Sequence, residues 1–163
     1  MTTPTPTKIR VQELLNYLPD SGNFTWKISL GRCRRDTKAG NPNHSGYWRI
    51  SIDTRYCFEH QLVWLMEHGE WPATNLDHID GNRSRNVISN LRLANKSENA
   101  QNIRQTRKDS ITGFLGVKKQ RNAWLARIQV DGKREHLGSF NSPEEAAEAY
   151  LKRKREIHPF NQL

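Results

Sequence analysis

The apolar positions near the N-terminus recur at helical spacing. They predict a helix over residues 8–17 with Thr7 as its N-cap. The apolar side of this helix would consist of Ile9, Val11, Leu14, Leu15 and Leu18. Residues 19–22, Pro-Asp-Ser-Gly, favour a turn, and Phe24-Thr25-Trp26 is then expected to form a short strand.

A hairpin and a second helix are expected to follow. The basic stretch 31–45 has the composition of a loop. Residues 47–52 and 55–58 alternate apolar with polar side chains and are split by Asp53-Thr54, which indicates a β-hairpin. A helix over about residues 61–67 would end at Gly69, because Trp71-Pro72 prevents its extension.

The centre of the chain predicts a strand, a polar loop, a second strand and a helix. The strands are expected at residues 75–79 and 91–93, with a tight turn at Asp80-Gly81 after the first. The helix would begin near Lys96, since Asn95 and Glu98 have the spacing of a capping box.

The C-terminal pattern predicts three strands and one helix. The strands are expected at residues 114–119, 124–130 and 133–137, with Asp131-Gly132 as the turn between the last two. A helix capped by Ser142 would run to about Ile157. Alternation within the second strand directs one set of side chains toward the helix, namely Trp124, Ala126, Ile128 and Val130. Its other set includes Arg127 and Gln129, which would face outward.

Together these elements indicate an α+β protein with small cores. Only 34% of the chain is hydrophobic, which favours two or three modest cores over one large core. We expect three parts: an N-terminal helix and hairpin region at 1–72, the strand-loop-strand-helix at 73–106, and the sheet-plus-helix domain at 110–163.

The charge indicates a polyanionic partner. Lys and Arg number 26 against 17 Asp and Glu, a net charge of +9, and nucleic acid is the commonest polyanion. Residues 1–103 carry 13 basic and 10 acidic side chains, and residues 104–163 carry 13 and 7. The alternative is a basic surface that binds nothing.

Cysteine content and hydropathy point to a cytosolic protein that does not contact a membrane. Two Cys give no disulfide framework, and the chain begins without an apolar signal segment. There is no apolar run of 18 residues that would span a bilayer. We therefore expect a reduced, cytoplasmic location.

Six Asn lie between residues 76 and 102, and one of them is not explained by turns or caps. Asn99 would sit one turn inside a helix, where Asn is unfavourable, with Asn102 at i+3. Asn99 and Asp77 are oxygen ligands of the kind that Mg²⁺ takes, and a neutral His78 beside them could accept a proton from water. These are the components of phosphodiester hydrolysis, although a lone His in a strand is more often structural.

The same stretch closely resembles the HNH endonucleases. The similar segments are Asp77-His78-Ile79-Asp80-Gly81-Asn82, Asn90-Leu91-Arg92 and Ser97-Glu98-Asn99, together with His60-Gln61-Leu62-Val63-Trp64 upstream. The resemblance is to the phage and mobile-element subgroup, whose last motif residue is Asn. It implies the ββα-metal fold, His78 as general base, and Asp77 and Asn99 as ligands of a divalent metal, Mg²⁺ or Mn²⁺. It further implies that Asn90 braces the loop, with Asn102 as a possible additional site residue.

The tail is similar to the plant ethylene-response-factor (Apetala-two) type of DNA-binding domain. The similarity lies in Gly113-Phe114-Leu115-Gly116-Val117, the Trp124 strand, Leu137-Gly138-Ser139-Phe140 and the Glu145–Tyr150 helix. It implies that the sheet binds the major groove of double-stranded DNA. The exposed candidates for this contact are Lys118, Arg127, Gln129, Arg134 and His136. Several Arg and Trp usual on that face in plants are lacking, so the target sequence does not transfer.

Other interpretations remain open from the sequence. A non-catalytic DNA-binding protein with a degenerate nuclease fold is the main alternative, and RNA is an alternative substrate. A structural zinc site is weaker, because the spacing of Cys33, His44, Cys57 and His60 matches no compact finger. A monomer would nick one strand, whereas a homodimer could cut both.

Overall fold

Helices and antiparallel strand pairs follow one another along the chain, so the fold class is α+β as predicted. The computed structural model describes residues 4–95, 98, 99, 102, 106, 110–130 and 132–158. Two compact units make up the chain, Met1–Ala94 and Asn95–Leu163. Their boundary falls inside the segment 73–106, and the three-part division stays a prediction.

The first unit opens with helix α1 (Lys8–Leu14), which begins where Thr7 caps it. The Thr7 hydroxyl accepts a hydrogen bond of 3.2 Å from the backbone N–H of Arg10. The predicted continuation of this helix to Tyr17 is wrong. Strand β1 (Leu15–Leu18) instead pairs antiparallel with β2 (Asn23–Trp26).

A cross-strand aromatic pair explains why β1 replaces the last helical turn. Tyr17 lies opposite Phe24 in the hairpin, and their rings stack with centroids 5.1 Å apart. Leu15, opposite Trp26, is buried in the same core. Extending the helix would give up this pairing and its ladder of backbone hydrogen bonds, which outweighs the helical spacing of the leucines.

The second sheet has the order β3 (Asn41–Pro42), β4 (Trp48–Ile52) and β5 (Arg55–Phe58), which confirms the hairpin. Its turn residues Asp53 and Thr54 have φ values of 46° and 69°, as a tight hairpin turn requires. Strand β3 lies inside the stretch 31–45 that was expected to be loop. Because Asn41 and Pro42 pair with β4, this short segment is a strand despite its composition.

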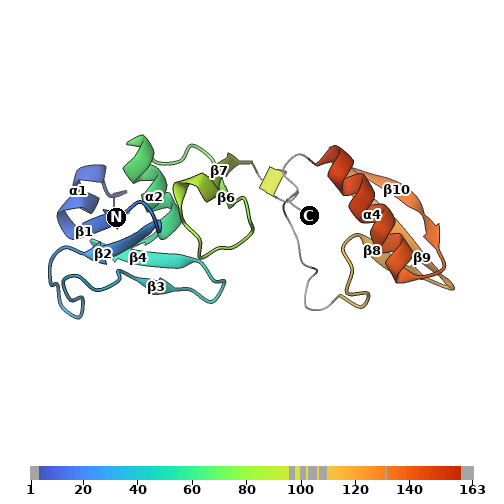
Figure 1. Cartoon of the computed structure of the whole chain (residues 1–163), viewed down its shortest axis with the longest axis horizontal. Helices are drawn as coiled ribbons and strands as arrows, with labels where there is room; N and C mark the ends of the chain where they lie inside the picture. Colours follow the sequence, from blue (N-terminus) through green and yellow to red (C-terminus); the bar gives the residue numbers. More distant parts are fainter. Residues whose placement is uncertain are drawn as a thin grey trace. The chain divides into compact units, whose positions relative to one another are not determined.

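Helix α2 (Glu59–His68) covers the inner side of this sheet and ends at Gly69, whose φ is 81°. The helix starts two residues before the predicted Gln61, so Glu59 and His60 lie in its first turn. Figure 1 shows α1 and α2 beside the strands of the first unit. The core they enclose consists of Val11, Leu14, Leu15, Phe24, Trp26, Ala39, Ile50, Ile52, Cys57, Leu62, Val63, Leu65 and Leu91.

Strands β6 (Asn75–His78) and β7 (Leu91–Ala94) pair antiparallel, as predicted, and complete the first unit. The loop between them closes with a short 3-10 helix, η1 (Ile88–Asn90). The register sets Asp77 opposite Arg92.

The second unit contains the predicted sheet of three antiparallel strands and its helix. The strand order is β10 (Lys133–Phe140), β9 (Ala123–Val130), β8 (Val117–Gln120). Helix α4 (Pro143–Ile157) lies along this sheet in Figure 1 and packs on it through the small residues Ala146 and Ala147. The Ser142 hydroxyl caps the helix by accepting from the backbone N–H of Glu145 at 3.2 Å.

Burial in the second sheet follows the predicted faces. Ala126 and Ile128 are buried, whereas Arg127 and Gln129 are exposed. The outer face is not wholly polar, because Leu125 is buried there as well. Strand β10 runs to Phe140, beyond the predicted residue 137, with an irregular register after His136. Asp131 of the predicted turn lies outside the described residues.

Gly22 provides a test of how the β1–β2 turn supports the loop after β6. Its φ is +66°, and an added Cβ would lie 2.2 Å from the backbone carbon of Asn86. Gly22→Ala should therefore lower the free energy of unfolding by at least about 2 kcal/mol, through backbone strain and this clash. Urea denaturation measures the difference.

Gly46→Ala is the matched control. Gly46 has a φ of +83° but nothing within 4 Å of an added Cβ, so it carries the backbone penalty alone. Equal losses of stability in the two variants would contradict the close approach of the turn to Asn86.

Candidate active site

His78 is the last residue of β6, and its imidazole is held inside the first unit. Its side chain is buried, with the residue only 4% exposed. Nε2 lies 2.9 Å from Oδ1 of Asn86, which comes from the loop between β6 and β7. Asn86 is itself 1% exposed, so this hydrogen bond is shielded from water.

Asn86 links His78 to a buried carboxylate. Its Nδ2 donates a hydrogen bond of 2.6 Å to Oε2 of Glu59, the first residue of α2. Burial raises the pKa of Glu59, and the hydrogen bond from Asn86 opposes that rise, as do the charge of Lys38 and a backbone hydrogen bond from Phe24. The start of a helix also favours negative charge. Glu59, Asn86 and His78 thus form one hydrogen-bonded chain across three segments.

Two aromatic rings pack against His78. The His60 ring meets it edge-on with centroids 5.2 Å apart, and the Tyr47 ring lies 6.0 Å away. Burial, helped by the nearby His78, lowers the pKa of His60 to about 3. His60 is therefore neutral at physiological pH and acts here as a packed aromatic ring.

Asp77 belongs to a different environment from its neighbour His78. Successive strand residues point to opposite faces, and their contacts agree with this. Oδ2 of Asp77 accepts from Nε and Nη2 of Arg92 at 3.0 and 2.8 Å, across the β6–β7 pair. The structure therefore does not gather Asp77 around His78, and it shows Asp77 in an ion pair.

Asn90 fastens the loop that carries Asn86. Its Nδ2 donates to Oδ1 of Asp80 and to the carbonyl of Arg85, at 2.9 and 2.8 Å. Its Oδ1 accepts from the backbone N–H of Asp80 at 3.1 Å. These are hydrogen bonds of the kind that bracing a loop requires.

Asn99 and Asn102 belong to the second unit. Asn95 and Glu98 form the predicted capping box, with reciprocal hydrogen bonds of 2.7 and 2.9 Å. Asn99 follows in helical conformation with its backbone bonded to Asn95, and it is exposed, whereas Asn102 is buried. The predicted start at Lys96 lies outside the described residues.

The residues predicted to contact DNA from the second sheet are all on its surface. The exposed side chains are those of Lys118, Arg127, Gln129, Arg134 and His136. Their position is compatible with a binding face, and their role remains a prediction.

Within the described part of the chain, no group of three or more His, Cys, Asp or Glu is arranged to hold a metal ion. The structure thus gives no support to the zinc alternative. A site of one carboxylate and one amide oxygen, completed by water and phosphate, is of a different kind. Asp77 and Asn99 each carry a hard oxygen donor of the kind that Mg²⁺ prefers, and their role as metal ligands stays a prediction.

Sequence reasoning missed the residues that hold His78. From the sequence, a turn alone accounts for Asn86, and the expected second helix begins only after Glu59 and His60. Both Glu59 and His60 are nevertheless buried polar residues directly after an expected strand. Buried polar side chains need hydrogen-bond partners, so these two residues indicate a polar network. The sequence does not show that Asn86 is the partner of Glu59.

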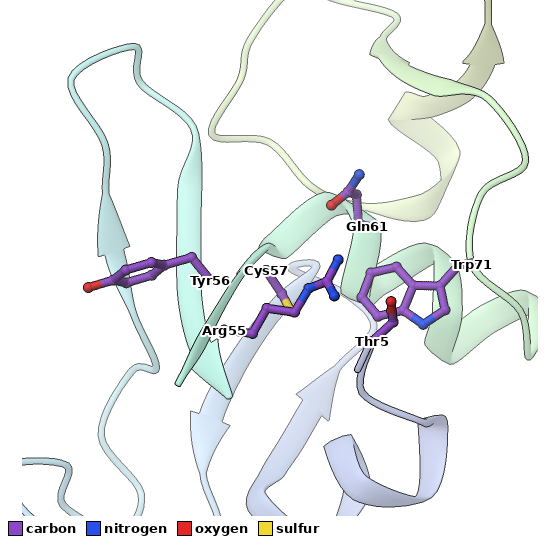
Figure 2. Close-up of a pocket in the computed structure, with 6 residues that line it drawn as sticks. All are labelled: Thr5, Arg55, Tyr56, Cys57, Gln61 and Trp71. Carbon is purple, nitrogen blue, oxygen red and sulfur yellow. The ribbon is translucent and has the colours of Figure 1, made fainter. Parts of the chain in front are cut away.

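A separate pocket of about 310 Å³ lies on the same unit. It is lined by Thr5, Arg55, Tyr56, Cys57, Gln61 and Trp71. Figure 2 shows that Arg55 and Trp71 lie close together, whereas the Tyr56 ring points away from them. None of the lining residues is a predicted site residue, and none is among Asn86, His60 and Tyr47, which contact His78.

Comparison with known proteins identifies the class to which this site belongs. A family model described as HNH endonuclease matches residues 57–101, a segment that contains Glu59, His78 and Asn86. This segment is therefore an HNH endonuclease domain, a type that acts on DNA and typically uses a divalent metal.

A phage relative extends the match beyond this domain. Protein 3.8 of Escherichia phage T7 is 35% identical over 102 residues, which are 61% of this chain and 83% of the phage protein. The chain therefore belongs to the same family as this phage protein, whose name states no activity. No solved structure matches the chain. The family match ends at residue 101, so the resemblance of the tail to the plant domain rests on the sequence alone.

The described helices include none that is both long and apolar enough to cross a membrane.

The neutral state of His60 gives a pH-dependent contribution to stability. Its folded pKa of about 3 is below the model-peptide value of 6.5, so the unfolded chain binds the proton more readily. This stability is present above pH 6.5 and is lost as the pH falls toward 3. His60 should add a slope of up to about 1.4 kcal/mol per pH unit in that window. Urea unfolding at several pH values measures it, and His60→Gln should remove this part of the slope.

His44→Gln is the control, because it removes an exposed imidazole from the same unit. If His60→Gln left the slope between pH 4 and 6 no different from that of His44→Gln, the burial of a neutral His60 would be wrong.

Proposed function

We propose that this protein is a metal-dependent DNA endonuclease of the phage or mobile-element type, with His78 as the general base. The observation that carries the proposal is the buried chain from Glu59 through Asn86 to His78, inside a segment of the HNH endonuclease family. A general base must be held in one orientation and one tautomer, and the hydrogen bonds from Glu59 through Asn86 to His78 would fix both for His78.

The chemistry of the three groups assigns the proton on His78. The amide nitrogen of Asn86 donates to Oε2 of Glu59, and its oxygen faces Nε2 of His78, which is the arrangement that an ionised Glu59 requires. That oxygen also only accepts, and Nε2 of His78 must then carry the hydrogen. Nδ1 is then the nitrogen without the hydrogen, and it is the atom proposed to take the proton from the attacking water.

Asp77 and Asn99 would bind the divalent metal, Mg²⁺ or Mn²⁺. When bound, the metal stabilises negative charge on the scissile phosphate and on the departing 3′ oxygen. Asp77 contributes a carboxylate whose orientation is set by Arg92, and Arg92 also neutralises its charge in the first unit. Asn90 braces the loop between β6 and β7, which keeps Asn86 against His78.

The second unit would hold double-stranded DNA through the exposed face of its sheet. Support comes from its basic charge and from the exposure of Arg127 and Gln129 on the face opposite α4. Arg and Gln can bind the major-groove edges of guanine and adenine, and they can also bind phosphates. This face would add to the affinity of the protein for double-stranded DNA.

A non-catalytic DNA-binding protein is the second candidate, and one observation favours it. Asp77, which the nuclease needs as a metal ligand, is in an ion pair with Arg92. A protein that no longer binds a metal could keep the fold and the basic surface with the Asp77–Arg92 ion pair in place. Activity separates the two candidates directly.

The main test is cleavage of supercoiled plasmid with Mg²⁺ and with EDTA. We expect metal-dependent nicked or linear product from the wild type and none from His78→Ala, whose DNA affinity should stay within a few-fold. Glu59→Gln should lower kcat about 10- to 100-fold with little change in KM, because Asn86 is then no longer held in one orientation.

Glu67→Gln is the matched control, since it makes the same change in α2 but at a glutamate that contacts Tyr17. Full activity of His78→Ala would remove His78 from the mechanism. Wild-type protein that binds plasmid but yields no product with Mg²⁺ or Mn²⁺ would favour the non-catalytic candidate.

A further inference from the structure

The sheet β3-β4-β5 has an outer face with two exposed aromatic side chains. In β4 and β5 the side chains alternate, so that Ile50 and Cys57 are buried while Arg49, Tyr56 and Phe58 are exposed. Arg49 lies directly opposite Phe58 in the register, which places them on one face. Tyr56 is 65% exposed and Phe58 is 37% exposed. Large side chains gathered on an open sheet face indicate a contact surface.

Two guanidinium groups lie over tyrosine rings on this face. Cζ of Arg49 is 4.4 Å from the ring centroid of Tyr56, and Cζ of Arg83 is 4.9 Å from that of Tyr47. Arg83 is fixed further by a hydrogen bond of 2.8 Å to the carbonyl of Ser45. Among the described residues, neither arginine makes an ion pair with a carboxylate. Both charges are thus pre-positioned on aromatic surfaces and available to an anion.

This face continues to His78 through ring contacts. Tyr47 lies two residues before Arg49 and packs edge-on against Phe58, with centroids 5.6 Å apart. The Tyr47 ring also contacts the His78 ring, with centroids 6.0 Å apart. Tyr47 therefore joins the exposed sheet face to the imidazole that we propose as the general base.

We propose that the outer face of β4 and β5, with Arg83, binds the sugar–phosphate backbone of double-stranded DNA beside the scissile phosphate. Arg49 and Arg83 would each take a phosphate, and Tyr47 would align the strand toward His78. The ring faces of Tyr56 and Tyr47 are covered by guanidinium groups, so they hold cations rather than stack on bases. The surface therefore binds DNA without sequence preference. The position of the scissile phosphate rests on the proposed function.

The test measures affinity rather than cleavage. The full chain is titrated against fluorescent DNA duplexes of unrelated sequence, in EDTA and over a range of salt concentrations. Arg49→Ala and Arg83→Ala should each weaken binding about 3- to 10-fold on every duplex. Each should also reduce the slope of log K against log salt by about 1, since one phosphate contact is lost. Tyr56→Leu should weaken binding less than Arg49→Ala, because it only releases the guanidinium.

Lys27→Ala is the control, since it removes one exposed charge from the same unit at a side chain bonded to the carbonyl of Gln12 in α1. If the arginine variants matched Lys27→Ala in affinity and salt slope, the proposed surface would be wrong. On single-stranded DNA, a larger loss of affinity with Tyr56→Leu than with Arg49→Ala would overturn the proposed backbone contact. It would indicate that the tyrosine stacks on bases.

Cleavage in Mg²⁺ separates this proposal from the proposed function. A wild type that cuts DNA, together with arginine variants of unchanged affinity, would overturn the surface and leave the nuclease intact. Lost affinity in the arginine variants of a protein that never cuts would support the surface and reject the nuclease. Arg127→Ala on the second sheet, assayed in parallel, should lower affinity independently of Arg49→Ala.

Discussion

The hydrogen-bonded chain Glu59–Asn86–His78 is the constraint on which the site depends. A carboxylate, an amide and an imidazole are buried together, and each would cost free energy if left without a partner. Pairing them ties the start of α2, the loop after β6 and the end of β6 into one arrangement. The close backbone approach of Gly22 to Asn86 adds the first hairpin to this arrangement. The fold of the whole first unit is thereby coupled to the orientation of one imidazole.

The orientation of His78 is set by residues of the HNH segment itself. All three members of the chain lie within residues 57–101, the part that matches the endonuclease family. A neutral ring at His60 and the ring of Tyr47 keep polar solvent from two sides of His78. The same Tyr47 lies at the start of an exposed face with two guanidinium groups, and neither makes an ion pair with a carboxylate within the part that the structure describes. The proposed DNA-binding face and the proposed base thus come from neighbouring strands, one helix and the loop between β6 and β7.

Local signals predicted most of the elements, because their causes are local. The Thr7 and Ser142 caps, the Asn95–Glu98 capping box and the left-handed Gly69 all act within a few residues of themselves. The end of α1 was wrong because leucines spaced for a helix also fit a strand, and the Tyr17–Phe24 pair decides between the two. The partnership of Glu59 with Asn86 spans 27 residues, and no local pattern encodes it. The family resemblance indicated His78 as the general base, a role that stays a prediction, and it could not supply the partners of its imidazole.

The most direct measurement is the tautomer of His78 by ¹⁵N NMR on protein labelled at histidine nitrogens, compared with His78→Gln to assign the signals. Our account predicts a hydrogen on Nε2 and an unprotonated Nδ1 at neutral pH, because Asn86 can only present its oxygen to Nε2. A hydrogen on Nδ1 with Nε2 unprotonated would contradict the account, because the buried carboxylate would then not set the orientation of the base.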